Sequence, residues 1–122
     1  MMTILLIDDS AGVRAVLSEA LAIEGYKVLE ASDGAEGVRL YREHRPGLAL
    51  VDMIMPEKDG IETVKEILEF DPDAVIFTFS GKDAGGDHQE TARILGAKKG
   101  FQKPLRVEVL LAAIRESLGD QK

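Results

Sequence analysis

The stretch Ile4-Leu5-Leu6-Ile7-Asp8-Asp9-Ser10 joins a run of large apolar residues to two acids and a residue that favours helix N-termini. A short continuous apolar run suits a strand that is buried on both faces, as in a parallel sheet. Ser10 is a good N-cap, and Val13, Leu17 and Leu21 follow it at helical spacing. The stretch therefore predicts a buried strand that leads directly into a helix, with two carboxylates at the junction.

The same alternation of short apolar runs and amphipathic windows continues along the chain. Further strands are predicted at residues 27–29, 48–51, 75–79 and 99–102. Helices are predicted after Ser10, after Asp33-Gly34, after Asp59-Gly60, at about 89–95, and after Pro104. Strands that alternate with helices and are buried on both faces indicate a doubly wound α/β fold of the (βα)5 type, with helices on both faces of a parallel sheet.

Composition excludes several classes of protein. The chain has 122 residues, no Cys, two His and a net charge of −7. The length suits a single domain over residues 1–122, with no output domain expected. The lack of Cys excludes a disulfide scaffold, a thiolate zinc site and a cysteine nucleophile. The acidic balance argues against direct binding to nucleic acid or anionic lipid. No signal peptide or membrane-spanning run is visible, so we expect a cytoplasmic protein.

Polar residues that could bind a ligand or take part in a reaction lie at the ends of the predicted strands. They are Asp8 and Asp9 after the first strand, Asp52 after the third, Ser80 after the fourth, and Lys103 after the fifth. In doubly wound sheets, ligands bind beyond the carboxyl ends of the strands. Crowded carboxylates repel one another unless a proton or a cation is present, and Mg²⁺ prefers oxygen ligands. A carboxylate supported by a metal could act as a nucleophile and form an aspartyl phosphate, with a lysine and a hydroxyl on the phosphoryl oxygens.

These motifs, in this order, resemble the receiver domains of two-component response regulators. The resemblance runs from about residue 3 to residue 118. The matching motifs are the acids Asp8-Asp9, the segment Asp52-Met53-Ile54-Met55-Pro56-Glu57-Lys58-Asp59-Gly60, Ser80-Gly81, Gly96-Ala97 and Lys103-Pro104. Each motif is weak alone, but together they are specific. The resemblance implies a flavodoxin-like receiver fold with strand order 2-1-3-4-5.

The resemblance also implies roles for the acidic residues. Asp52 would be the phosphoacceptor. Asp9 and Asp52 would bind Mg²⁺ directly, Asp8 would bind it through water, and the backbone carbonyl of Ile54 would be a further ligand. These assignments require the four residues to lie around one ion.

The remaining motif residues receive supporting roles. By resemblance, Ser80 and Lys103 contact the phosphoryl group, and the bond between Lys103 and Pro104 is cis. From the residues themselves, Gly60 is expected to be structural, because glycine tolerates positive φ in a turn that leads into a helix.

One position departs from the family pattern. The family usually carries Tyr or Phe three residues before the lysine, and here that position is Gly100. Phe101 is the less favoured candidate for a switch residue, since strand alternation turns it to the face opposite Gly100. We hypothesise that the loop at residues 81–88 carries more of the response to phosphorylation, as a change between order and disorder.

Three other functions compete with a phosphorylated receiver. A phosphatase of the haloacid dehalogenase class, which forms an aspartyl phosphate, would need a second Asp where this chain has Ile54. A flavodoxin-type FMN carrier would need a phosphate-binding loop where Asp8 and Asp9 stand. A phosphorylation-independent adaptor with a receiver fold stays open, because Gly100 permits it while the acids and Lys103 argue against it.

The sequence therefore predicts a stand-alone response regulator, not a dedicated enzyme, with autodephosphorylation expected. It would take a phosphoryl group from a histidine kinase or a histidine phosphotransfer protein and signal to an unknown downstream protein by direct contact. Neither nucleic acid nor membrane is an expected partner. The expected state is a monomer or a dimer linked to phosphorylation.

Overall fold

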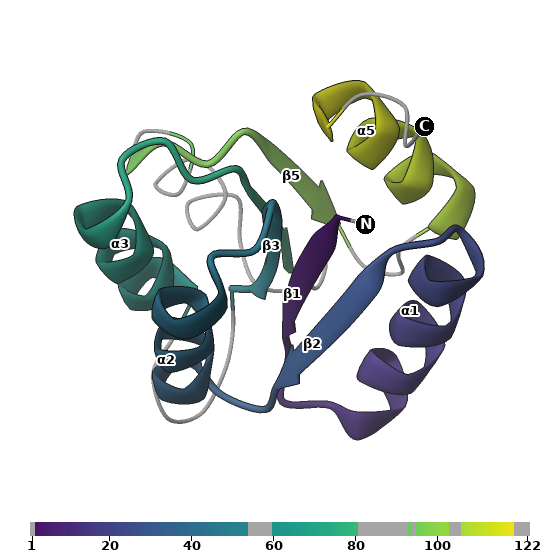
Figure 1. The fold of residues 1–122 in the computed structure, drawn as a ribbon, viewed down its shortest axis with the longest axis horizontal. Coiled ribbons are helices and arrows are strands. Elements are labelled where there is room, and N and C mark those ends of the chain that lie inside the picture. The colour runs from purple at the N-terminus through teal and green to yellow at the C-terminus, as the bar shows by residue number, and fades with distance from the viewer. Residues whose placement is uncertain (1, 54–59, 81–92, 94, 103–105, 119–122) are drawn as a thin grey trace.

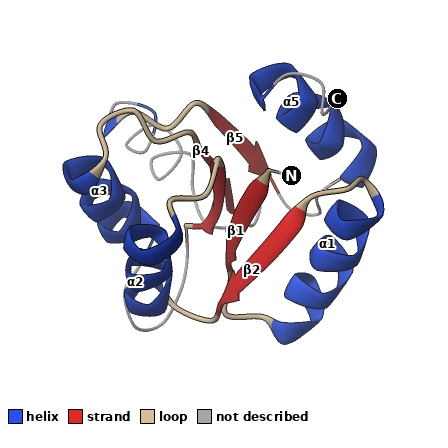
Figure 2. Cartoon of the chain, viewed as in Figure 1, coloured by secondary structure: helices blue, strands red, loops and turns tan. Residues whose placement is uncertain are grey.

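The architecture is that of a parallel sheet between two layers of helices (Figures 1 and 2). The computed structural model describes residues 2–53, 60–80, 93, 95–102 and 106–118. The strands are β1 (Thr3–Ile7), β2 (Lys27–Ala31), β3 (Leu48–Asp52), β4 (Ile76–Ser80) and β5 (Lys99–Gln102). The helices are α1 (Ala11–Ile23), α2 (Gly34–His44), α3 (Gly60–Phe70) and α5 (Val107–Leu118).

The five strands are all parallel and lie in the order β2-β1-β3-β4-β5. This confirms the doubly wound fold that the sequence pattern predicts and the strand order that the family resemblance implies. The observed β2 extends two residues beyond the predicted run, and β4 is shifted by one residue. Most of the window predicted as a helix at 89–95 lies outside the described residues.

Side chains that alternate along the strands divide the interior into two cores. Leu5, Ile7, Val51 and Ile76 belong to the core on the side of α2 and α3. The intervening apolar residues of the same strands face α1 and α5: Ile4, Leu6, Leu48, Leu50, Phe77 and Phe79. Figure 1 shows the two helical layers on opposite sides of the sheet. Burial on both faces explains the unbroken apolar runs at residues 4–7 in β1 and 48–51 in β3.

Local contacts begin α1 and α2 where the sequence predicts. The Ser10 hydroxyl accepts a hydrogen bond from the Val13 amide at 3.2 Å, which caps α1. The Asp33 carboxylate accepts from the Glu36 amide at 2.8 Å, and Glu36 accepts from the Ser32 amide at 2.9 Å. The first bond caps α2, and the second holds the residue before the cap against the first turn of the helix. Both helices therefore start close to the carboxyl end of the strand that precedes them.

No helix among the described residues is long and apolar enough to cross a membrane.

Candidate functional site

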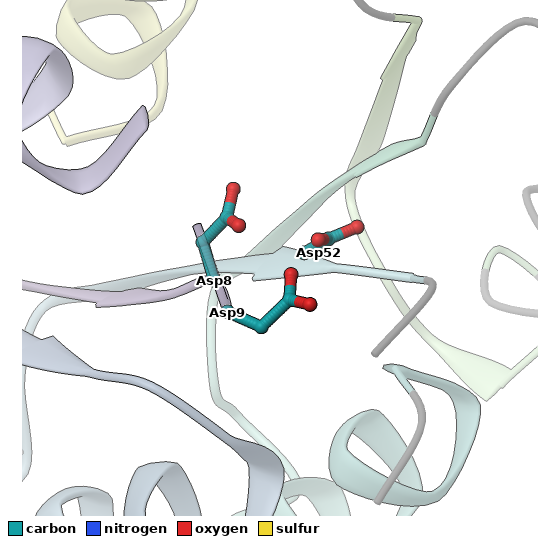
Figure 3. A group of neighbouring side chains, drawn as sticks. All are labelled: Asp8, Asp9 and Asp52. Atoms are coloured by element: carbon teal, nitrogen blue, oxygen red, sulfur yellow. The ribbon is translucent and has the colours of Figure 1, made fainter. Parts of the chain in front are cut away.

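Three carboxylates gather beyond the ends of two adjacent strands. Asp8 and Asp9 follow β1, and Asp52 is the last residue of β3, which pairs directly with β1. One carboxylate oxygen from each residue lies within 4.8 Å of the others. Figure 3 shows these side chains side by side at the edge of the sheet. The structure thus brings together the three acids that the sequence singles out.

Asp8 is held by both its main chain and its side chain. It is fully buried, and its backbone amide donates a hydrogen bond to the Ala31 carbonyl at 3.1 Å, which extends the pairing of β1 with β2. Its carboxylate oxygen Oδ1 accepts from the Ser10 amide at 2.8 Å. The carboxylate is therefore fixed in place before any ligand arrives.

Asp9 and Asp52 differ in their access to solvent. Asp52 is 2% exposed at the end of a fully buried strand, whereas Asp9 is exposed. The following residue, Met53, continues the pairing with β4 by donating its amide hydrogen to the Phe79 carbonyl at 2.9 Å. The site therefore has two buried carboxylates with one exposed carboxylate at its opening.

The charges in this cluster favour a cation. Two unit charges at 4.8 Å repel by about 3.5 kcal/mol at an effective dielectric near 20. The pair formed by Asp8 and Asp52 is buried, so solvent screens it little. Three carboxylates also form a hard oxygen donor set, which suits a hard divalent cation. The residues present thus fit a metal ion.

Gly60 fits the site for a different reason from the one that the sequence suggested. Its φ is not positive; among described glycines, Gly25 and Gly96 have that conformation. A Cβ at position 60 would instead lie 2.4 Å from the Met53 Cα and 2.6 Å from the Asp52 carbonyl oxygen. The expectation of positive φ was wrong, because the constraint is the close approach of α3 to the end of β3.

Several residues that the sequence singles out are not among the residues that the structure describes, and one is described by its backbone alone. Ile54, Lys103 and Pro104 are not among the described residues, and neither is the loop at 81–88. Ser80 is placed by its backbone as the last residue of β4, where it pairs with Gln102. The roles assigned to these residues stay predictions.

Strand β5, which carries Gly100 in place of the family's aromatic residue, packs against the sheet through Phe101. The Phe101 ring centroid lies 5.7 Å from that of Phe77, in the core that faces α1 and α5. Gly100 precedes it and pairs with Thr78 of β4. Phe101 therefore has a packing role on the face opposite the position where the family carries its aromatic residue.

Arg14 contacts the site, and no motif in the sequence marks it as a site residue. Its side chain extends from the first turn of α1, donates from Nη1 to the Asp8 carbonyl oxygen at 2.6 Å, and pairs with Glu30 at 3.3 Å. A signal was available: Arg14 follows Asp9 by five residues, and the acidic Glu30 lies near the end of the neighbouring strand β2.

Comparison with known proteins agrees with this geometry. Residues 4–115 match the family described as response regulator receiver domain. The chain is 37% identical to the chemotaxis protein CheY of Bacillus subtilis, over 94% of this chain and 96% of that protein. It is 32% identical to sporulation initiation phosphotransferase F of the same organism, over 94% and 92% of the two chains.

A solved structure adds a likeness of fold. The CheX-CheY-BeF3-Mg complex from Borrelia burgdorferi matches with a TM-score of 0.88 and 28% identity, over 98% of this chain and 90% of that chain. The family match covers nearly the whole chain, and the two Bacillus subtilis relatives align over more than nine-tenths of their length. The chain therefore belongs to the receiver domains of two-component response regulators.

Proposed function

We propose that this receiver domain accepts a phosphoryl group from a phosphohistidine onto Asp52 in a reaction that requires Mg²⁺. The observation that carries the proposal is the gathering of the Asp8, Asp9 and Asp52 carboxylates within 4.8 Å at the ends of β1 and β3. The likeness to a complex that contains BeF3 and Mg²⁺ supports the choice of metal. Asp9 and Asp52 would bind the ion directly, Asp8 through water, and the Ile54 carbonyl would complete the protein ligands.

The proposed chemistry is a transfer between two nucleophiles. A carboxylate oxygen of Asp52 attacks the phosphorus and the phosphorus–nitrogen bond of the donor breaks. The bond's electron pair stays on that nitrogen, and the ring, which carries a proton from solvent on its other nitrogen, leaves as neutral imidazole. Bound Mg²⁺ would neutralise charge on the phosphoryl oxygens. Ser80 and Lys103 are proposed to contact the same oxygens. Hydrolysis of the aspartyl phosphate by water would return the domain to its starting state.

The burial of Asp52 supports its role as the acceptor. At 2% exposure, its carboxylate is held at the end of a rigid strand, so a donor must be brought to it in a defined orientation. Asp9 is exposed and lies at the opening, where a metal ion and a donor can approach. Asp52 therefore lies at the fixed end of a strand, and Asp9 lies where an incoming ion and donor would reach the site.

The proposed partners are a histidine kinase or a histidine phosphotransfer protein as donor, and a downstream protein that recognises the phosphorylated surface. Receiver domains are signalling proteins, and we propose that this one has no dedicated enzymatic activity. The cytoplasmic location expected from the sequence stays a prediction, as does the monomer or phosphorylation-linked dimer.

Intact-mass analysis after incubation with acetyl phosphate tests the proposal. The wild-type chain should gain one phosphoryl group with Mg²⁺ and none with EDTA, and hydroxylamine should remove it, since acyl phosphates react with that nucleophile. Asp52→Asn should gain none, whereas Asp73→Asn, a matched change at an exposed acid, should behave as wild type. A phosphoryl group retained on Asp52→Asn would refute the assignment. No gain by the wild type would favour a phosphorylation-independent adaptor.

A further inference from the structure

Arg14 links the loop that carries two of the acids to the neighbouring strand. Its Nη1 donates to the Asp8 carbonyl oxygen at 2.6 Å, and its Nε lies 3.3 Å from the Glu30 carboxylate. The Arg14 side chain is only 18% exposed, whereas that of Glu30 is 45% exposed. One guanidinium therefore bridges a main-chain acceptor at the site and a carboxylate on β2.

The main-chain acceptor is the important partner. The carbonyl of Asp8 belongs to the planar peptide unit that joins Asp8 to Asp9. A bond to that oxygen restrains the plane, and the plane sets the position of the Asp9 Cα from which the side chain leaves the backbone. The Ser10 amide and the Ala31 carbonyl already hold Asp8 on either side. Arg14 adds the restraint at the junction between the two acids.

Glu30 gives the guanidinium a defined orientation. Among the described residues, no other carboxylate lies within 4.0 Å of the Arg14 side chain. A guanidinium is a planar group with donors at fixed angles, so it can serve two acceptors that lie in different directions. The ammonium of a lysine is a compact donor and cannot reproduce that bridge.

We infer that Arg14 is a positioning residue for metal binding: it holds the peptide between Asp8 and Asp9 so that both carboxylates face Asp52. The inference rests on the proposed function in taking Mg²⁺ as the ligand. The alternative is that Arg14 acts only as a nearby positive charge. The two roles predict opposite changes in Mg²⁺ affinity when Arg14 loses its charge. Removing a positive charge beside a cation site strengthens metal binding by Coulomb's law, whereas loss of positioning weakens it.

The test is a Mg²⁺ titration of the unphosphorylated protein by calorimetry, with the Asp9 and Ser10 amide resonances followed in parallel. We expect Arg14→Gln to raise the Mg²⁺ dissociation constant by roughly tenfold, at the low end of effects seen for residues that orient metal ligands. Arg14→Lys should also raise it, since charge is kept but the bridge is lost. Glu30→Gln should raise it less, because the contact with Asp8 survives.

Arg115→Gln is the matched control. Arg115 pairs with Glu24, the C-cap residue of α1, at 3.0 Å. Like Arg14 and Glu30, these two residues form an Arg–Glu pair. Glu24 lies ten residues beyond Arg14, about 15 Å along a helix. This variant should leave the Mg²⁺ dissociation constant unchanged. Urea unfolding in EDTA, run on every variant, separates loss of stability from loss of metal affinity.

Each outcome decides the matter. A dissociation constant for Arg14→Gln that equals or falls below the wild-type value would overturn the inference, as would a wild-type value for Arg14→Lys. If Arg14→Gln does not fold, Arg14→Lys and Glu30→Gln carry the test. A wild-type protein that binds Mg²⁺ yet never gains a phosphoryl group would refute the proposed function and leave the positioning role intact.

Discussion

Asp52→Asn should make the metal-free domain more stable. In the wild type, carboxylate oxygens of Asp8 and Asp52 lie within 4.8 Å of each other, and both residues are buried. Each such pair costs about 3.5 kcal/mol at an effective dielectric near 20. Asp9 adds less, because it is exposed and solvent screens its charge. Asp52 takes part in at least one further interaction, and the change to an amide removes only part of the repulsion, so we expect a net gain of about 2 kcal/mol in the free energy of unfolding.

Urea unfolding in EDTA and in saturating Mg²⁺ measures this gain. With a slope of about 2 kcal/mol per molar urea, the metal-free midpoint should rise by about 1 M in the variant. Mg²⁺ that binds only the folded state stabilises the wild type by about 2.7 kcal/mol at 100 times its dissociation constant. The variant lacks a ligand and should gain little, so the difference between the two proteins should close or reverse in Mg²⁺.

The control keeps the chemistry of the change and moves it out of the cluster. Asp73 is exposed beyond the end of α3, and Asp73→Asn should shift neither midpoint. The reasoning fails if metal-free Asp52→Asn unfolds at the same urea concentration as wild type or lower. It also fails if Mg²⁺ stabilises the variant as much as it stabilises the wild type.

Three further changes test separate features of the fold. Gly60→Ala should lower the free energy of unfolding by about 2–3 kcal/mol by urea denaturation, because its Cβ has no room against the backbone at the end of β3. Ser10→Ala should cost about 1 kcal/mol in the same assay, since the bond from the Val13 amide is lost. Burial and the hydrogen bond to Asp71 raise the pKa of Tyr41 above its ordinary value, so its stabilising effect is complete below about pH 10 and fades above it. The stability of wild type relative to Tyr41→Phe should therefore fall by about 1.4 kcal/mol per pH unit above pH 10, in unfolding experiments at a series of pH values; a constant difference would contradict it.

The strands could be predicted because a strand that is buried on both faces appears in the sequence as a short apolar run. Residues 4–7 of β1 and 48–51 of β3 are continuous apolar runs, and these residues divide between the two cores. β2 is an edge strand with exposed Lys27 and Glu30, so the apolar pattern gives only part of its length. The boundary of β4 moves by one residue because Ser80 pairs with Gln102 although its side chain is polar.

The gathering of acids could also be predicted, but their environments could not. Parallel strands end at the same edge, so Asp8, Asp9 and Asp52 had to lie near one another. Which acid is buried depends on where each backbone leaves the sheet. Asp8 continues the ladder with β2 through its amide and is buried, whereas Asp9 has already turned toward α1 and is exposed. Adjacent identical residues give no hint of this difference.

Arg14 escaped prediction because its chief partner is a main-chain oxygen. Sequence patterns identify a contact by the side chains at both ends, and the carbonyl of residue 8 would be present whatever side chain stood there. The pair with Glu30 is only partly informative, since an arginine on a helix has many acids within reach in a chain with 22 Asp+Glu. Contacts from side chains to the backbone of a functional loop are therefore the class that requires a structure, and here one such contact lies at the peptide between two acids of the site.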